Sequence, residues 1–117
     1  MYDGSLLGPD GKPDMNRIAA VFPEHGSGEI DHSTPHGRNF TFAIYPSGGG
    51  YDAVILSQPG YGSRSSGLHD THRLPGPNGY AKICFAKQPQ DLQTTIALAI
   101  WWAECTSEYI STGGSWK

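Results

Sequence analysis

Residues 90–111 carry the strongest secondary-structure pattern in the chain, and this pattern limits what the remaining residues can form. Apolar side chains recur there at the spacing of an α-helix, and Gln90 and Asp91 stand at its start. The apolar side chains form two neighbouring stripes, one of Leu92, Ile96, Ala99 and Ala103 and one of Leu98, Trp102, Cys105 and Tyr109. Gly113 and Gly114 provide a C-terminal stop. So wide an apolar arc needs a sheet on one side and loops on the other.

Three segments supply candidate strands for that sheet. Residues 40–45 and 51–56 are rich in aromatic and branched side chains, and the short connection between them predicts an antiparallel pair. In residues 80–85, alternation places Ala81, Ile83 and Phe85 on one face, and Tyr80, Lys82 and Cys84 on the other. The sequence therefore predicts an α+β fold with a small antiparallel sheet packed on one main helix.

The other segments read as irregular, and the 117 residues are long enough for one domain, 1–117. Residues 1–38 form a lead-in with a short helix expected at 15–21, capped by Asp14 and stopped by Pro23. The polar, turn-rich residues 24–38 follow. Residues 57–79 predict a long loop, and such loops in compact domains are usually functional or disordered.

Composition excludes some classes of function. The net charge is −3 with no run of Lys or Arg, which argues against a nucleic-acid groove. No stretch approaches the ~20 apolar residues that span a bilayer. The N-terminus lacks the pattern of a signal peptide, so we expect a cytoplasmic protein whose two cysteines are free thiols.

Cys84 is the candidate for chemistry. It shares its strand face with Lys82 and follows a loop that contains His69 and His72. A nucleophilic cysteine needs exposure and nearby positive charge, which this arrangement offers. The alternative is an ordinary half-buried strand residue. Cys105, inside the helix, is expected to act as a small core hydrophobe.

Metal and cofactor sites receive little support from the sequence. The chain has no tight Cys pair of the C-x-x-C type that structural zinc sites use, so we expect no metal. His25, His32 and His36 are interpreted as loop residues in solvent. Residues 48–50 lack the lysine and the following helix of a phosphate-binding loop, so no cofactor is expected either.

Three local patterns together resemble the ubiquitin-conjugating enzyme family, especially divergent bacterial members. Residues 39–46 (NFTFAIYP) are similar to the strand that ends in the family's Tyr-Pro. Residues 72–84 (HRLPGPNGYAKIC) are similar to its segment from His-Pro-Asn to Gly-x-Ile-Cys, with two extra residues. Residues 88–96 (QPQDLQTTI) are similar to the proline and helix that follow the cysteine. The ending TGGSW, residues 112–116, is similar to members found in antiphage operons with cyclic-nucleotide synthases.

The resemblance implies a ubiquitin-conjugating-like (UBC-like) fold in which Cys84 carries a protein C-terminus as a thioester and passes it to an amine. His72 would shape or polarise the site, with His69 as a weaker candidate. The cargo implied is a cGAS-like nucleotidyltransferase in antiphage defence (CBASS), loaded by a separate activating enzyme. The family's catalytic Asn is replaced by Leu74, so Asn78 or a backbone N–H would have to stabilise the oxyanion.

Two other functions remain open from the residues. One is a non-catalytic binding module whose contact surface would include Tyr45, Tyr51, Tyr61 and one of Trp101 and Trp102. The other is a small Cys-His hydrolase in which Asp70 orients the imidazole.

Overall fold

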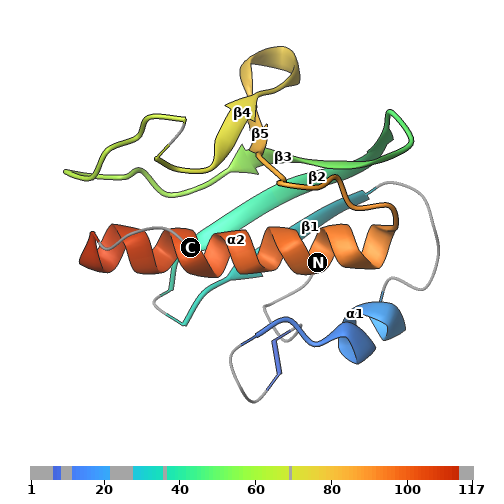
Figure 1. Cartoon of the computed structure of the whole chain (residues 1–117). Helices are drawn as coiled ribbons and strands as arrows, with labels where there is room; N and C mark the ends of the chain where they lie inside the picture. Colours follow the sequence, from blue (N-terminus) through green and yellow to red (C-terminus); the bar gives the residue numbers. More distant parts are fainter. Residues whose placement is uncertain (1–6, 9–11, 22–27, 36, 69, 114–117) are drawn as a thin grey trace.

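A computed structural model describes residues 7–8, 12–21, 28–35, 37–68 and 70–113 of the chain. Its elements follow the order α1 (Met15–Val21), β1 (Gly28–Ser33), β2 (Asn39–Ser47), β3 (Gly50–Ser57), β4 (Arg73–Pro75), the 3₁₀ turn η1 (Pro77–Gly79), β5 (Ala81–Ile83) and α2 (Leu92–Thr112). The strands form one antiparallel sheet in the order β1-β2-β3-β5-β4. Helix α2 lies across one face of this sheet, and α1 packs against α2 (Figure 1). The predicted α+β fold with one main helix is confirmed at this level.

The predicted hairpin of β2 and β3 is confirmed, and its turn explains part of the glycine run. Ser47 pairs with Gly50, so Gly48 and Gly49 alone make the connection. Both have positive φ, +59° and +88°, which is the conformation that two-residue hairpin turns require and that side chains other than glycine rarely adopt.

The predicted main helix is also confirmed, including both of its ends. Asp91 is the N-cap, and its carboxylate accepts a 2.7 Å hydrogen bond from the Thr94 N–H. Gly113 closes the other end in the left-handed conformation, with φ of 71°. The Arg64 guanidinium donates to the carbonyls of Ile110 and Ser111, so a cation satisfies the negative end of the helix dipole.

The short helix α1 begins as expected. The Asp14 side chain accepts hydrogen bonds from the backbone N–H groups of Asn16 and Arg17, at 2.9 and 3.2 Å. Ile18 is fully buried and joins the core. The predicted stop at Pro23 lies outside the described residues.

The core lies between α2 and the facing sides of β2 and β3. Trp102 is its largest side chain, and its ring meets Phe40 and Phe42 edge to face at centroid distances of 5.9 and 6.0 Å. These geometries are favourable for aromatic rings and are worth about 0.5–1.5 kcal/mol each beyond area burial. Of the two adjacent tryptophans, Trp102 is therefore the core residue. It is 2% exposed, whereas Trp101 is 38% exposed.

Two strands differ from the sequence prediction. Residues 28–33, predicted to be part of a turn-rich segment, form β1 because Ile30 and His32 point inward while their neighbours stay polar. An edge strand with only two inward side chains leaves too short an alternation to recognise. Within the predicted loop 57–79, residues 73–75 form β4 and pair with β5.

Candidate active site at the end of strand β5

The Cys84 thiol is exposed at the point where β5 ends. The predicted strand 80–85 is shorter in the structure, where β5 covers only Ala81–Ile83. Ile83, the last residue of β5, is nevertheless buried and Cys84, the next residue, is exposed, as the predicted alternation requires. Both Cys84 and Cys105 are free thiols, as the sequence predicts.

His72 lies directly opposite Cys84 in the backbone. The β4–β5 register pairs Arg73 with Ile83, and the next pair is joined by a 2.9 Å hydrogen bond from the Cys84 N–H to the His72 carbonyl. His72 is half-buried and has a φ of 53°, which is uncommon for a residue other than glycine. The fold thus brings His72 next to Cys84 through backbone pairing. His69 lies outside the described residues.

A network of hydrogen bonds fixes the loop that delivers His72. Thr71 is fully buried; its carbonyl accepts from the Trp102 indole at 3.1 Å, and its hydroxyl accepts from the Arg73 guanidinium at 2.8 Å. The same guanidinium stacks over the Tyr61 ring, 5.1 Å from its centroid. Thr71, before His72, is therefore anchored to the core helix, and Arg73, after it, is anchored to Thr71 and Tyr61.

Lys82, which the sequence places on the same strand face as Cys84, is paired with a carboxylate. The Lys82 ammonium forms a 3.2 Å ion pair with the carboxylate of Asp52 on β3. The expected electropositive support for the thiol is therefore largely neutralised by a carboxylate on the neighbouring strand.

A cavity of about 230 Å³ opens beside Cys84. We call it the Cys84 groove; its lining residues are Ile83, Cys84, Phe85, Ala86, Lys87, Leu98, Trp101 and Trp102. Leu98 and Trp101, 37% and 38% exposed, lie one helical turn apart on α2 and form its wall on the helix side. Sequence reasoning placed Leu98 in an apolar stripe and did not assign it or Lys87 to a site. The signal for Leu98 was its i, i+3 spacing from Trp101 on the helix that follows the cysteine, whereas no sequence pattern indicated Lys87.

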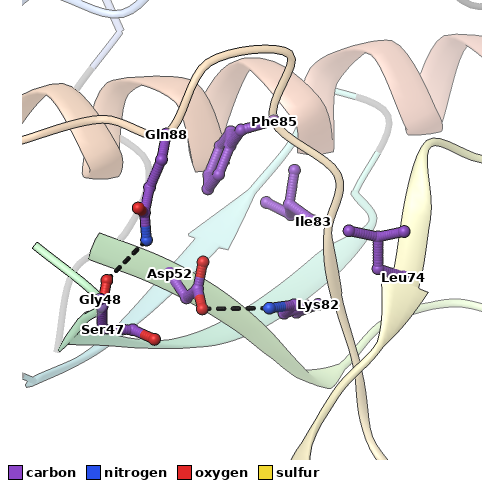
Figure 2. Close-up of a pocket in the computed structure, with 8 residues that line it drawn as sticks. All are labelled: Ser47, Gly48, Asp52, Leu74, Lys82, Ile83, Phe85 and Gln88. Atoms are coloured by element: carbon purple, nitrogen blue, oxygen red, sulfur yellow. Dashed lines mark hydrogen bonds and ion pairs between the residues drawn. The ribbon is translucent and has the colours of Figure 1, made fainter. Parts of the chain in front are cut away.

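A second cavity, of about 290 Å³, lies on the other side of Ile83 and Phe85. Figure 2 shows the Asp52–Lys82 pair, Leu74 and Gln88 in its lining. The Gln88 amide donates a 2.7 Å hydrogen bond to the Ser47 carbonyl. It forms because β5 pairs with β3 only at two positions and then diverges. Farther along β3, the Tyr51 N–H donates instead to the Pro89 carbonyl at 2.9 Å.

Gly50 permits this return of the chain to β3. A Cβ at this position would lie 2.6 Å from the Pro89 carbonyl oxygen. Any larger residue would therefore push the segment 84–89 away from the sheet and move the wall that both cavities share.

The structure separates Asn78 from the thiol. Asn78 lies in η1 at the tip of the β4–β5 hairpin, whereas Cys84 lies at its base. The four residue steps from 80 to 84 span roughly 13 Å at the rise of a strand. Asn78 is therefore at the wrong end of the hairpin to stabilise an oxyanion formed at Cys84.

The sequence interpretation of three residues as exposed is wrong. His32, expected in solvent, is fully buried on β1, and its Nε2 lies 2.7 Å from a carboxylate oxygen of Glu104 on α2. Tyr51 and Tyr61, expected on a contact surface, are 8% and 7% exposed because each packs into the protein. His25 and His36 lie outside the described residues.

Cys105 differs from Cys84 in its surroundings. It is half-buried on α2, and desolvation by burial raises the pKa of its thiol, with the neighbouring Glu104 carboxylate adding in the same direction. A raised pKa lowers the thiolate fraction of Cys105. The sequence places Cys105 in the core, whereas the structure has it half-buried and outside the cluster of buried core residues described above.

Within the described part of the chain, no group of three or more His, Cys, Asp or Glu side chains is arranged to hold a metal ion. No helix there is long and apolar enough to cross a bilayer. Comparison of the chain with protein-family models, curated proteins and solved structures finds no match in any of the three.

Proposed function

We propose that this chain is a ubiquitin-conjugating-enzyme-like acyl carrier of UBC-like fold, and that Cys84 holds the C-terminal carboxyl group of a partner protein as a thioester. The observation that supports this most directly is the position of Cys84, an exposed free thiol that borders an apolar groove. A thiol that must meet two protein substrates in succession has to be accessible, and the groove offers a surface on which a peptide tail can lie.

The chemistry needs two acyl transfers and no oxidant. The Cys84 thiolate attacks an activated carbonyl carbon; a C–S bond forms and the activating group leaves. An amine then attacks the thioester, a C–N bond forms, the C–S bond breaks and the thiol is regenerated. His72, opposite Cys84, is the candidate to shape or polarise the site, and His69 is a weaker one.

The resemblance to bacterial ubiquitin-conjugating-like proteins supplies the proposed setting. The cargo would be a cGAS-like nucleotidyltransferase, the compartment the cytoplasm and the process antiphage defence. Activation of the carboxyl group by ATP would belong to a separate activating enzyme, so the proposal implies no cofactor for this chain.

Mass spectrometry of the protein co-expressed with the products of its neighbouring genes tests the proposal. We expect a thiol-sensitive protein adduct on the wild type and on Cys105→Ser, none on Cys84→Ala, and a thiol-resistant ester on Cys84→Ser. Cys105→Ser is the matched control, since it removes the other free thiol. An adduct that is absent from all forms, while the same neighbours still co-purify, would contradict the proposal.

A non-catalytic binding module is the second candidate, and one observation favours it. Leu98 and Trp101 expose apolar surface side by side on α2, which is typical of a contact patch. In that case Cys84→Ala would retain partner binding and all biological activity.

A further inference from the structure

We infer that the Cys84 groove selects the cargo by its last residues, taking an apolar, preferably aromatic side chain beside the reacting carboxyl group and an acidic residue upstream. This inference rests on the proposed function and adds the substrate class. It makes Trp101 and Leu98 specificity-determining residues, and it makes Lys87 the contact for the acidic residue.

The groove places an apolar wall next to the reacting atom. Cys84 is itself one of the lining residues, so a side chain within one or two positions of the thioester would enter the groove. Phe85 on one side and Trp101 with Leu98 on the other present carbon surface to it. Trp101 offers an exposed indole, and aromatic pairs gain energy beyond simple burial.

The size of the groove favours a side chain as its occupant. Its volume of about 230 Å³ is below the ~300–1,000 Å³ that sites for drug-sized ligands and cofactors have. A single aromatic residue of an extended tail is a better match for this space than a whole nucleotide or prosthetic group.

The charge of the groove also limits which C-terminal tails of a cargo protein fit it. Lys87 is the one charged side chain among the residues that line the groove, and it is exposed. An acidic residue upstream of the apolar one would meet this ammonium, whereas a basic residue would be repelled by it.

Short peptide thioesters test the inference without the natural cargo. The probes are acetyl-Asp-Phe-Gly, acetyl-Asp-Ser-Gly and acetyl-Lys-Phe-Gly, each as the mercaptoethanesulfonate thioester. In the reaction Cys84 forms a new C–S bond to the glycine carbonyl, the C–S bond to mercaptoethanesulfonate breaks, and that thiol leaves. The rate of acyl transfer to the purified protein is followed by intact mass.

We expect the Phe probe to load Cys84 about tenfold faster than the Ser probe, the effect of partly burying one aromatic side chain. Trp101→Ala and Leu98→Ala should remove most of that preference. Tyr80→Ala is the matched control, because Tyr80 is a similarly exposed aromatic residue that lines neither cavity. Lys87→Glu should reverse the preference between the Asp-Phe-Gly and Lys-Phe-Gly probes.

The outcomes separate this inference from the proposed function. Equal loading by all three probes would overturn the inference and leave Cys84 as an acyl acceptor. Loading of Cys105 but not Cys84 would remove the proposed function itself. If Trp101→Ala instead turns a dimer into a monomer in solution and leaves the probe preference unchanged, the groove binds a second copy and the inference is wrong.

Discussion

The part of the sheet formed by β1, β2 and β3 and the edge formed by β4 and β5 are held in different ways. The first has strands of six to nine residues, and its inner face packs the Phe40, Phe42 and Trp102 rings together. The second has two strands of three residues each, and Leu74 and Tyr80 remain exposed on it. Cys84 lies on this second, lightly packed edge. The comparison indicates that the packed region stabilises the fold and that the edge keeps the Cys84 thiol accessible. Substitutions in the packed region should therefore lower the free energy of unfolding more than substitutions on the edge.

The largest difference is expected between the adjacent tryptophans. Trp102→Ala removes a buried ring and the indole hydrogen bond to Thr71, and should lower the free energy of unfolding by about 3–5 kcal/mol. Trp101→Ala should stay within about 0.5 kcal/mol because its ring lies in an open groove. Urea denaturation of both variants measures the contrast. Equal losses would mean that the groove is part of the core.

A smaller loss is expected from the pair that joins β1 to α2. Glu104→Ala leaves the buried His32 ring without its acceptor and should cost about 1–3 kcal/mol. Glu108→Ala, an exposed glutamate on the same helix, is the control and should remain near wild type. If Glu104→Ala leaves the free energy of unfolding unchanged, the contact between His32 and Glu104 does not stabilise the packing of β1 on α2.

The N-cap of α2 connects the two regions, because the segment after Cys84 ends there. Asp91→Ala should cost about 1 kcal/mol, whereas Asp91→Asn, which keeps an acceptor oxygen, should cost less. Thermal unfolding monitored by circular dichroism compares them. If the asparagine variant loses as much as alanine, the carboxylate acts through its charge at the helix start.

The smallest effect is expected on the edge itself. Lys82→Met and Asp52→Asn should each change stability by about 1 kcal/mol, because the Lys82 side chain is 28% exposed to solvent, although that of Asp52 is only 11% exposed. The double variant should show only weak coupling in a mutant cycle. We also expect Cys84 alkylation to change little in the double variant Lys82→Met/Asp52→Asn, since it removes both charges of a pair that is neutral overall. A large fall in the alkylation rate would show that the Lys82 ammonium supports the Cys84 thiolate, as the sequence predicts.

The sequence by itself determined the elements whose signals are local. The helical spacing and the Asp91 and Gly113 ends of α2 lie within residues 90–113, and the aromatic and branched side chains of residues 40–45 and 51–56 identified β2 and β3. Alternation also gave the correct faces for Ile83 and Cys84, although the strand ends before the thiol. These features depend on residues two to four positions apart in the chain, and a sequence pattern can detect such neighbours.

Only the tertiary structure decided the features that depend on distant partners. Strand β1 exists because it pairs with β2, and His32 is buried because α2 covers that edge with Glu104. Likewise, the Asp52 carboxylate forms an ion pair with Lys82. The sheet covers Trp102, whereas Trp101 is exposed in the groove. Burial and charge pairing depend on which segments meet in space, and spacing along the chain does not contain that information.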